Sequence, residues 1–383
     1  PLPVTGRTLL LVAGEASGDL HAARLLGELR PLVPELEAFG LGGEELAAAG
    51  QRQLAESREI AVVGISEALR ILPRARQIFR AILCEVDRAR PAAAVLVDFP
   101  EFNLRLAAAL KKRGVPVIYY ISPQVWAWRQ GRVRKIRRTV DELLVLFDFE
   151  EAFFRERGVA AVHVGHPLID EVPDPGFLAG RLPAREGPHR LALLPGSRRS
   201  EIDHLLPAML GAVGILRRDR PVEARIVRAP SVDPALLNAH MERSGVEVPV
   251  VSEARFTEIA ESDLALCASG TATLEVGLLC TPMVVVYRLA RGSMLLARLL
   301  VDLPHFSLVN LVLRRGVVPE LLQEQVNPQS LAAAARGLLD DPARRLRMRE
   351  ELAELRSHLG EPGASRRAAL RVAAHLRGRA EWS

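Results

Sequence analysis

Short apolar runs, built mostly of Val, Leu and Ile, alternate with helix-length segments along the first half of the chain. Nearly continuous apolar runs of this kind, separated by helices, are typical of a parallel sheet covered on both faces. We expect strands at Leu9–Val12, Ala93–Val97, Val117–Ile121, Leu143–Leu146 and Val162–Val164, and helices at Leu20–Leu29, Leu104–Lys112 and Arg129–Arg138.

A segment rich in Pro and Gly, residues 170–189, interrupts this alternation and is the best candidate for a linker. The alternation then resumes, and the chain from Pro328 onward has a helical pattern. Further strands are expected at Leu191–Leu194, Ala224–Val227, Val248–Val251, Leu264–Cys267 and Met283–Val286.

The pattern therefore predicts an α/β protein with two doubly wound, Rossmann-like domains, residues 1–169 and 190–340, and a helical tail, residues 341–383. The tail is expected to pack on the N-terminal domain of its own chain or of a neighbour. Ligands of open parallel sheets bind beyond the carboxyl ends of the strands, so we expect a ligand cleft between the two domains.

Composition narrows the class of protein. Hydrophobic residues make up 49% and charged residues 25% of the 383 residues, as in a folded soluble protein. No apolar run approaches the roughly 18 residues that span a bilayer, and the first residues lack a signal-peptide pattern. The three cysteines, Cys84, Cys267 and Cys280, are too far apart for a zinc site or a disulfide framework, so a cytosolic protein is expected.

The charge pattern indicates the kind of molecule that the protein binds. The net charge is +5 and the basic residues are clustered, which favours an anionic partner such as a phosphorylated substrate or an acidic membrane. Aromatic residues are only 4% and do not interleave with the basic runs, so binding of a nucleic acid is not expected. The histidines are scattered and no acidic triad has the spacing of a magnesium site, so we expect no metal ion and no cofactor.

The segment LALLPGSRRSEI, residues 191–202, reads as a strand, a turn and a helix start. Backbone N–H groups at such a turn, together with the helix dipole, suit a phosphate. Gly196, Ser197 and Arg198 are the candidate ligands, with the Arg198 guanidinium as a bidentate partner. An ordinary strand-to-helix turn with solvated arginines is the alternative.

A second turn of this kind is ASGTATLE, which follows the apolar run Leu264–Cys267. Ser269, Gly270 and Thr271 lie at the expected start of a helix, and Glu275 lies one helical turn further on. A carboxylate there can accept both ribose hydroxyls of a nucleotide. The two turns together predict a nucleotide site.

The motif AGEASGDLH follows the first expected strand. Glu15, Ser17, Gly18 and Asp19 are candidates for the acceptor side of the cleft. The motif is not GxGxxG, so it does not support a Rossmann cofactor. Ser17 or Asp19 could instead only cap the next helix.

The motif VDFPEFN places Asp98 at the end of a buried strand. A partly desolvated carboxylate at the edge of a sheet is a candidate general base. Glu101 has a second interpretation, because the first turn of the following helix also favours a negative charge.

Two further loops are candidates for the cleft. In ISPQVWAWR, Ser122 and Gln124 follow a strand end and could contact a sugar or a phosphate, although a loop packed on the core through its two tryptophans fits as well. In VGHP, His166 could act in the cleft or be a structural residue at the domain junction.

Two basic segments could meet an anionic surface. Six Arg and Lys residues fall between positions 129 and 138. Residues 60–83 combine an apolar stripe with arginines, which describes a helix lying on a membrane and equally a core helix with a basic outer face. The candidate membrane residues are Val62, Val63, Ile65, Arg74, Arg76 and Arg80.

These motifs together resemble one family. AGEASGD, VDFPEFN, SPQVWAWR, VGHP, LLPGSR, ASGTATLE, PMVVVYR, SLVN and PELLQE occur here in the order seen in lipid-A-disaccharide synthases, over residues 9–325. The resemblance implies an inverting glycosyltransferase of the GT-B fold, peripheral on the inner face of the inner membrane of Gram-negative bacteria. It also implies a step of lipopolysaccharide synthesis that joins UDP-2,3-diacylglucosamine to 2,3-diacylglucosamine 1-phosphate, yielding the β(1→6) disaccharide 1-phosphate and UDP. A homodimer is left open.

By the same resemblance, Asp98 corresponds to the essential aspartate of the family. The positions matched to the nucleotide pocket are Arg198, Glu275, Asn310, Arg288 and Gln323. The chain departs from the commonest pattern at Asp148, where Pro is frequent, and at Glu101, where Asp is frequent. The longer Glu101 side chain makes a direct catalytic role less secure.

Two alternatives remain from the sequence alone. One is another UDP-sugar enzyme of the same fold, such as a transferase with a soluble acceptor or a hexosamine epimerase. The other is a non-catalytic basic protein that binds nucleic acid or membrane, which leaves both phosphate-type turns unexplained.

Overall fold

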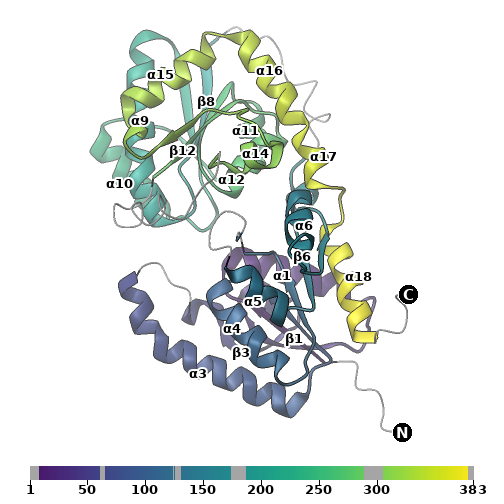
Figure 1. The fold of residues 1–383 in the computed structure, drawn as a ribbon. Coiled ribbons are helices and arrows are strands. Elements are labelled where there is room, and N and C mark those ends of the chain that lie inside the picture. Colours follow the sequence, from purple (N-terminus) through teal and green to yellow (C-terminus); the bar gives the residue numbers. More distant parts are fainter. Residues whose placement is uncertain are drawn as a thin grey trace. The chain divides into compact units, whose positions relative to one another are not determined.

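The computed structural model describes residues 8–60, 65–123, 125, 131–173, 187–288 and 305–377. The chain divides into two compact units (Figure 1). The first unit runs up to Pro167 and takes up the chain again from Gly360, and the second runs from Leu168 to Leu359. The predicted domain boundaries were at 169/170 and 340/341. In the structure, residues 341–359 of the predicted helical tail belong to the second unit, and the tail from Gly360 onward belongs to the first.

The first unit is built on a seven-stranded parallel sheet with the order β3-β2-β1-β4-β5-β6-β7. Its central strands are the apolar runs of the sequence, and every residue of β4 is buried. The strands are β1 (Thr8–Ala13), β2 (Glu37–Gly42), β3 (Arg52–Glu56), β4 (Ala93–Val97), β5 (Val117–Tyr120), β6 (Glu142–Val145) and β7 (Ala161–His163).

Helices cover both faces of this sheet. One hydrophobic core joins alternate residues of β1, such as Leu10 and Val12, to α3, α4 and α5. Helices α1 and α18 pack against each other and against β4. The helical elements are α1 (Ala16–Leu29), α2 (Glu44–Ala48), η1 (Ser57–Glu59), α3 (Ile65–Ala89), α4 (Pro100–Lys111), α5 (Arg132–Thr139), α6 (Asp148–Arg155) and α18 (Ala364–Arg377).

The second unit has a six-stranded parallel sheet with the order β10-β9-β8-β11-β12-β13. Its strands are β8 (His189–Leu194), β9 (Val222–Val227), β10 (Val250–Val251), β11 (Leu264–Ala268), β12 (Met283–Tyr287) and β13 (Glu320–Leu322). Its helical elements are α7 (Leu168–Glu171), α9 (Arg199–Asp219), α10 (Pro234–Ser244), α11 (Arg255–Ala260), α12 (Thr271–Leu278), α14 (Leu308–Leu313), η3 (Gln323–Gln325), α15 (Pro328–Leu339), α16 (Pro342–Ala353) and α17 (Leu355–Leu359).

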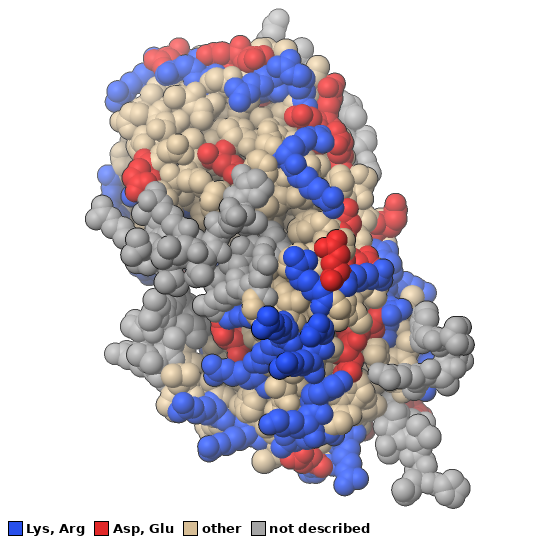
Figure 2. Space-filling model, in the orientation of Figure 1, with Lys and Arg blue, Asp and Glu red and all other residues tan. Residues whose placement is uncertain are grey.

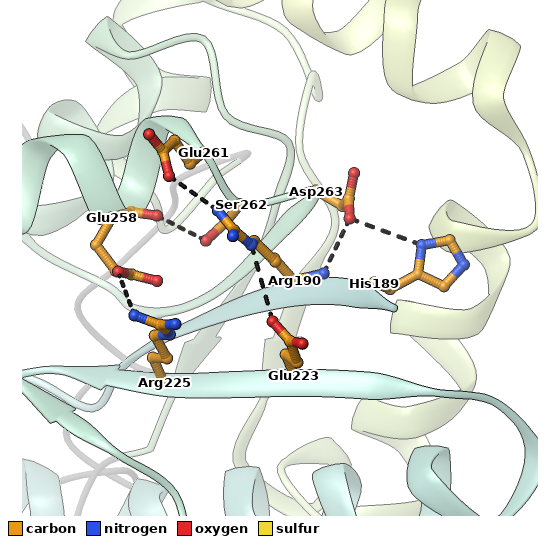
Figure 3. A network of polar contacts seen from close by, with 8 residues as sticks. All are labelled: His189, Arg190, Glu223, Arg225, Glu258, Glu261, Ser262 and Asp263. Atoms are coloured by element: carbon orange, nitrogen blue, oxygen red, sulfur yellow. Dashed lines mark hydrogen bonds and ion pairs between the residues drawn. The ribbon is translucent and has the colours of Figure 1, made fainter. Parts of the chain in front are cut away.

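Charged residues fasten the amino ends of the strands in the second sheet (Figure 3). Arg190 on β8 donates through its N–H to the Asp263 carboxylate at 2.9 Å and through its guanidinium to Glu261 at 2.8 Å. Arg225 on β9 pairs with Glu258 on α11 at 3.1 Å. Arg190 and Asp263 lie at the ends of β8 and β11 opposite to the phosphate-type turns, so their bonds stabilise the sheet away from the carboxyl ends of these strands.

The predicted α/β class with two doubly wound sheets is confirmed, and each expected strand is present within about two residues of its predicted ends. Three strands were not predicted, namely β2, β3 and β13. Their sequences, EAFGLG, RQLAE and ELL, carry charges, Gly or only three residues, so they lack the apolar run that identifies a buried strand. Within the described residues, no helix is long and apolar enough to cross a bilayer.

Candidate functional site

Polar side chains of the first unit follow the carboxyl ends of neighbouring strands. Glu15 follows β1, Asp98 follows β4, Ser122 follows β5 and His166 follows β7. Because these strands are parallel, their carboxyl ends meet at one edge of the sheet. The sequence therefore brings these four candidates to the same edge.

Asp98 occupies an unusual backbone conformation. Asp98 and Phe99 both have positive φ, 45° and 48°, and α4 begins directly after them at Pro100. A left-handed residue with a Cβ costs about 1–2 kcal/mol, so two in succession need compensating contacts. The Asp98 N–H donates to the Tyr120 carbonyl at 3.1 Å, which extends the β4–β5 ladder by one bond.

The aromatic ring of Phe99 explains a glycine of the first motif. A Cβ at Gly14 would lie 2.2 Å from the Phe99 ring, so no larger residue fits while the ring stays there. The ring also stacks on Phe102 at 5.6 Å between centroids. The motifs AGEASGD and VDFPEFN are therefore packed directly against each other at the edge of the sheet.

Asp19 has a structural role that the sequence did not reveal. Its carboxylate accepts hydrogen bonds from the N–H groups of Gly43, at 2.6 Å, and Glu45, at 3.0 Å. Asp19 is almost fully buried and lies in the first turn of α1, together with Ser17 and Gly18. It therefore caps α2 rather than its own helix, and both of its carboxylate oxygens accept a hydrogen bond within the first unit.

Ser122 is likewise held by a neighbour. Its hydroxyl donates to the buried carboxylate of Glu150 at 2.6 Å, and that carboxylate also accepts the N–H groups of Leu146 and Phe147 at 3.2 Å each. Glu150 was not predicted from the sequence. Gln124 and the two tryptophans of this loop lie outside the described residues.

His166 is buried beside Phe147, with 5.4 Å between ring centroids. Burial, together with the smaller effect of the nearby His21 and His163, lowers its pKa to about 3. The imidazole is therefore neutral at physiological pH and too weakly basic for a general base. This favours the structural interpretation of His166.

Glu101 lies in the first turn of α4, with an exposed side chain that pairs with Arg132 on α5. The pair connects two helices on the surface. This arrangement fits the helical interpretation of Glu101 and leaves Asp98 as the stronger candidate for a base.

In the second unit, the turn after β8 already carries a negative charge. The Glu201 carboxylate accepts the N–H groups of Ser197, at 2.9 Å, and Arg198, at 3.2 Å. A Cβ at Gly196, which has φ 109°, would lie 2.3 Å from that carboxylate. The expectation that these two N–H groups face a phosphate is therefore corrected, because Glu201 takes both of them.

The remaining donors of this turn are the Arg198 side chain and the start of α9. The Arg198 side chain is 66% exposed and lies 3.9 Å from the Glu201 carboxylate. Arg199 and Ser200 begin α9, where N–H groups have no partner within the helix. The turn can thus still receive an anion, through the guanidinium and the first turn of the helix.

The turn after β11 has the predicted form. Gly270 is the residue before α12 and has φ 147°, while Thr271 starts the helix with an exposed side chain. Ser269 donates its hydroxyl to the Phe306 carbonyl at 2.9 Å. Ser269 therefore holds the segment before α14 and uses its donor for that purpose.

Glu275 is mostly buried, one helical turn beyond Thr271, and an Arg255 nitrogen lies 3.5 Å from its carboxylate. Burial raises the pKa of Glu275. The positive charge of Arg255 opposes this rise and the negative charge of Glu171 adds to it. A desolvated carboxylate with one cation beside it is suited to accept hydrogen bonds from ribose hydroxyls.

Asn310 uses its whole side-chain amide within the unit. Its oxygen accepts the N–H groups of Val317 and Val318, and its nitrogen donates to the Val318 carbonyl and to Glu320. An amide has two donors and two acceptor positions, so none remains for a nucleotide. Asn310 therefore braces the segment between α14 and β13, which corrects the expectation of direct contact.

Glu320, one of the partners of Asn310, was not predicted as a functional residue. Its carboxylate accepts hydrogen bonds from the N–H groups of Phe306 and Ser307, the Ser307 hydroxyl and the Asn310 amide, over 2.7–2.9 Å. Nearby, Arg288 is exposed after β12 and Gln323 follows β13 with φ 53°. Both lie at carboxyl ends of strands in the second sheet.

The membrane candidates are only partly described. Val62, Val63 and the side chain of Ile65 lie outside the described residues. Arg74 pairs with Glu59. Arg76 and Arg80 are exposed and form no ion pair or hydrogen bond with the residues that the structure describes. In the described ranges, no three His, Cys, Asp or Glu side chains could hold a metal ion together.

Solved structures share this two-sheet fold. The chain aligns with the S. aureus MnaA-UDP co-structure at a TM-score of 0.64 and 13% identity, over 97% of each chain. It aligns with CalG4, the calicheamicin glycosyltransferase, at a TM-score of 0.59 and 18% identity, over 98% of this chain and 99% of that one. The predicted GT-B fold is confirmed.

Sequence comparison is more specific. A relative from Myxococcus xanthus (strain DK1622), named lipid-A-disaccharide synthase, is 46% identical over 366 residues, which are 94% of this chain and 95% of that protein. A relative of the same name from Syntrophus aciditrophicus (strain SB) is 40% identical over 372 residues, 96% of this chain and 97% of that protein. A family model described as lipid-A-disaccharide synthetase matches residues 9–374. The chain therefore belongs to the lipid-A-disaccharide synthetase family.

Proposed function

We propose that this enzyme transfers the sugar of UDP-2,3-diacylglucosamine to the 6-hydroxyl of 2,3-diacylglucosamine 1-phosphate. The products are the β(1→6) disaccharide 1-phosphate and UDP. The observation that carries the proposal is the family match over residues 9–374. The site geometry supports it, because Asp98 and Glu275 each follow a strand of a GT-B-type sheet.

Asp98 is the general base of this reaction. It accepts the proton of the 6-hydroxyl while that oxygen bonds to C1 of the donor sugar. The bond between C1 and the phosphate oxygen breaks at the same time, and UDP leaves with the electron pair. A single displacement of this kind inverts the anomeric centre. The location of Asp98 at the end of a buried strand, in a braced turn, supports this role.

The second unit binds UDP. Arg198 and the first N–H groups of α9 meet the diphosphate, and the start of α12 offers a second helix N-terminus nearby in the sheet order. Glu275 accepts the ribose hydroxyls. Positive charge at the diphosphate stabilises the charge that develops on the departing UDP. Hydrogen bonds of Asn310, Ser269 and Glu320 hold the segment 306–320 in place. Arg288 and Gln323 follow β12 and β13, two strands that pair with each other.

The first unit meets an anionic membrane through basic helices, which would make the enzyme peripheral on the inner face of the inner membrane. Lys and Arg side chains gather over the part of this unit that holds α4 and α5 (Figure 2). The pKa of Lys135 on α5 is lowered by burial and by the neighbouring charges of Arg105 and Arg132. On α3, Leu72 is 38% exposed among exposed arginines. A homodimer remains a further proposal.

The first test is UDP release from the two lipid substrates in mixed micelles containing EDTA. We expect turnover by the unmodified enzyme and a loss of about a hundredfold to ten-thousandfold in Asp98→Asn, since a missing general base costs about 10²–10⁴ in rate. Asp98→Asn should still bind UDP. Glu101→Gln is the matched control, an acid three residues away that we expect to retain most of the activity.

The other outcomes are equally informative. UDP binding without turnover of these lipids would replace the proposed acceptor by a soluble one, or the reaction by an epimerisation, since a UDP-GlcNAc 2-epimerase from Neisseria meningitidis shares this fold. An active Asp98→Asn would keep the reaction and move the search for the base to Glu15.

A further inference from the structure

The turn that carries Asp98 depends on two side chains to which no role has been given. Asp98 and Phe99 are successive left-handed residues, φ 45° and 48°. A bulky residue such as Phe adopts this conformation only where the surroundings determine it. Gly14 and Phe102 confine the Phe99 ring, as described above.

Asn103 is the first of the two side chains. It lies on α4, is fully buried, and donates from Nδ2 to the carbonyls of Val97, at 3.1 Å, and Asp98, at 2.8 Å. Its neighbours Phe102, Leu104 and Leu106 are all buried apolar residues. A polar amide in such a place is costly unless it makes hydrogen bonds, and the two Nδ2 bonds are the ones that this side chain makes with the described residues, because its Oδ1 has no partner among them.

Tyr119 is the second. It lies on β5, is fully buried, and its hydroxyl donates to the same Asp98 carbonyl at 2.5 Å. The Asp98 carbonyl thus accepts two hydrogen bonds, from two different elements. Its N–H donates to the Tyr120 carbonyl at 3.1 Å. Both polar groups of the Asp98 backbone are therefore fixed.

We propose that Asn103 and Tyr119 are positioning residues that hold Asp98 in its left-handed turn and so aim its carboxylate at the acceptor hydroxyl. The inference rests on the proposed role of Asp98 as the base. A base must lie within hydrogen-bond reach of the proton it removes, and a displacement of about 1 Å can cost about a hundredfold in rate. Neither side chain needs to touch the substrate to have this effect.

The decisive variant is Tyr119→Phe, which keeps the ring and removes only the hydroxyl. We expect kcat to fall by about tenfold or more, with KM for the UDP-sugar and the Kd for UDP unchanged. Thr281→Val is the matched control, because its buried hydroxyl also donates to a backbone carbonyl, that of Ile259 at 2.9 Å, in the second unit. The control should retain its kcat. Asn103→Ala should also lower kcat. If Asn103→Ala does not fold, Tyr119→Phe alone tests the proposal.

A double-mutant cycle separates positioning from a general structural effect. Once Asp98 is replaced by Asn there is no base to aim, so adding Tyr119→Phe should not lower the residual rate further. An equal loss in both backgrounds, or full activity of Tyr119→Phe, would overturn the inference while leaving Asp98 as the base. Wild-type turnover by Asp98→Asn alone would instead overturn the proposed base.

Discussion

At the residue scale, the acids of the candidate motifs differ in what holds them. Asp19 and Glu201 accept backbone N–H groups and so serve as caps, whereas Glu101 pairs with a surface arginine. Asp98 has a fixed backbone, and Glu275 is desolvated beside a single arginine. Four of these five acids were named as candidates from the motifs and Glu201 was not, but only their partners separate structural from chemical roles.

Glu275 gives a prediction about pH. Its pKa is raised by burial, and Arg255 opposes the rise. Only the ionised carboxylate accepts hydrogen bonds from both ribose hydroxyls, so affinity for UDP should fall as the pH drops through this pKa. Arg255→Gln removes the opposing charge, and the fall should then begin at a higher pH. Calorimetric titration of UDP across the acid range measures this.

The control for that experiment is Arg225→Gln, which removes an arginine of the same unit from its pair with Glu258. Its UDP affinity should follow the unmodified protein at each pH. If the UDP affinity of Arg255→Gln falls at the same pH as that of the unmodified protein, Glu275 does not contact the nucleotide.

At the element scale, the sequence predicted the strands built on an apolar run and missed the strands that lack one. Buried runs such as those of β4 and β11 identify themselves because every residue is apolar. β3 is an edge strand with no fully buried residue, so its polar sequence resembles a loop. Asn103 and Glu320 were missed for a related reason, since their partners lie on other elements and no spacing in the sequence brings them together.

Helix α18 illustrates such a contact and gives a prediction. Glu142, at the start of β6, is buried and accepts hydrogen bonds from Arg371, at 2.6 Å, and His375, at 2.7 Å. Burial raises the pKa of Glu142, but these two bonds outweigh it and lower the pKa below its ordinary value. A depressed carboxyl pKa stabilises the fold above the unfolded pKa of 4.5, and the stabilisation is lost as the pH falls below it.

We therefore expect Glu142→Gln to destabilise the first unit by ~2 kcal/mol at neutral pH, because Arg371 and His375 lose their ionised acceptor. The deficit should shrink as the pH falls below 4.5, the ordinary pKa of the group. Urea unfolding of the two proteins at pH 7 and near pH 4 measures both values. Glu151→Gln, which breaks a surface pair with Arg155, should cost less than about 1 kcal/mol at either pH. An equal loss for Glu142→Gln at both pH values would contradict the charge-based explanation.

At the scale of the whole molecule, the chain enters the second unit at Leu168 and returns to the first at Gly360. The last helix therefore completes the unit in which the chain began. Arginines hold both segments: Arg356 donates to the carbonyls of Val172 and Pro173, and Arg367 to those of Val164 and Pro362. The tail could be recognised as helical from sequence, but its division between two units could not, because α16 and α18 have similar compositions.

The distribution of charge over the two units gives the last prediction. Arg76 and Arg80 on α3 are exposed, and neither pairs with a described residue. Each basic residue near an anionic membrane contributes about 1 kcal/mol, so the double variant Arg76→Glu and Arg80→Glu should lose at least ~30-fold in affinity for vesicles containing anionic lipid at low salt. Arg344→Glu with Arg347→Glu, exposed on α16 of the second unit, changes the net charge equally. If binding depends on α3 rather than on total charge, vesicle sedimentation will detect the loss only in the first pair, and the difference will diminish as salt screens the surface. Equal losses in both pairs would show that net charge alone governs binding, and unchanged binding in both would remove α3 from the membrane-facing surface.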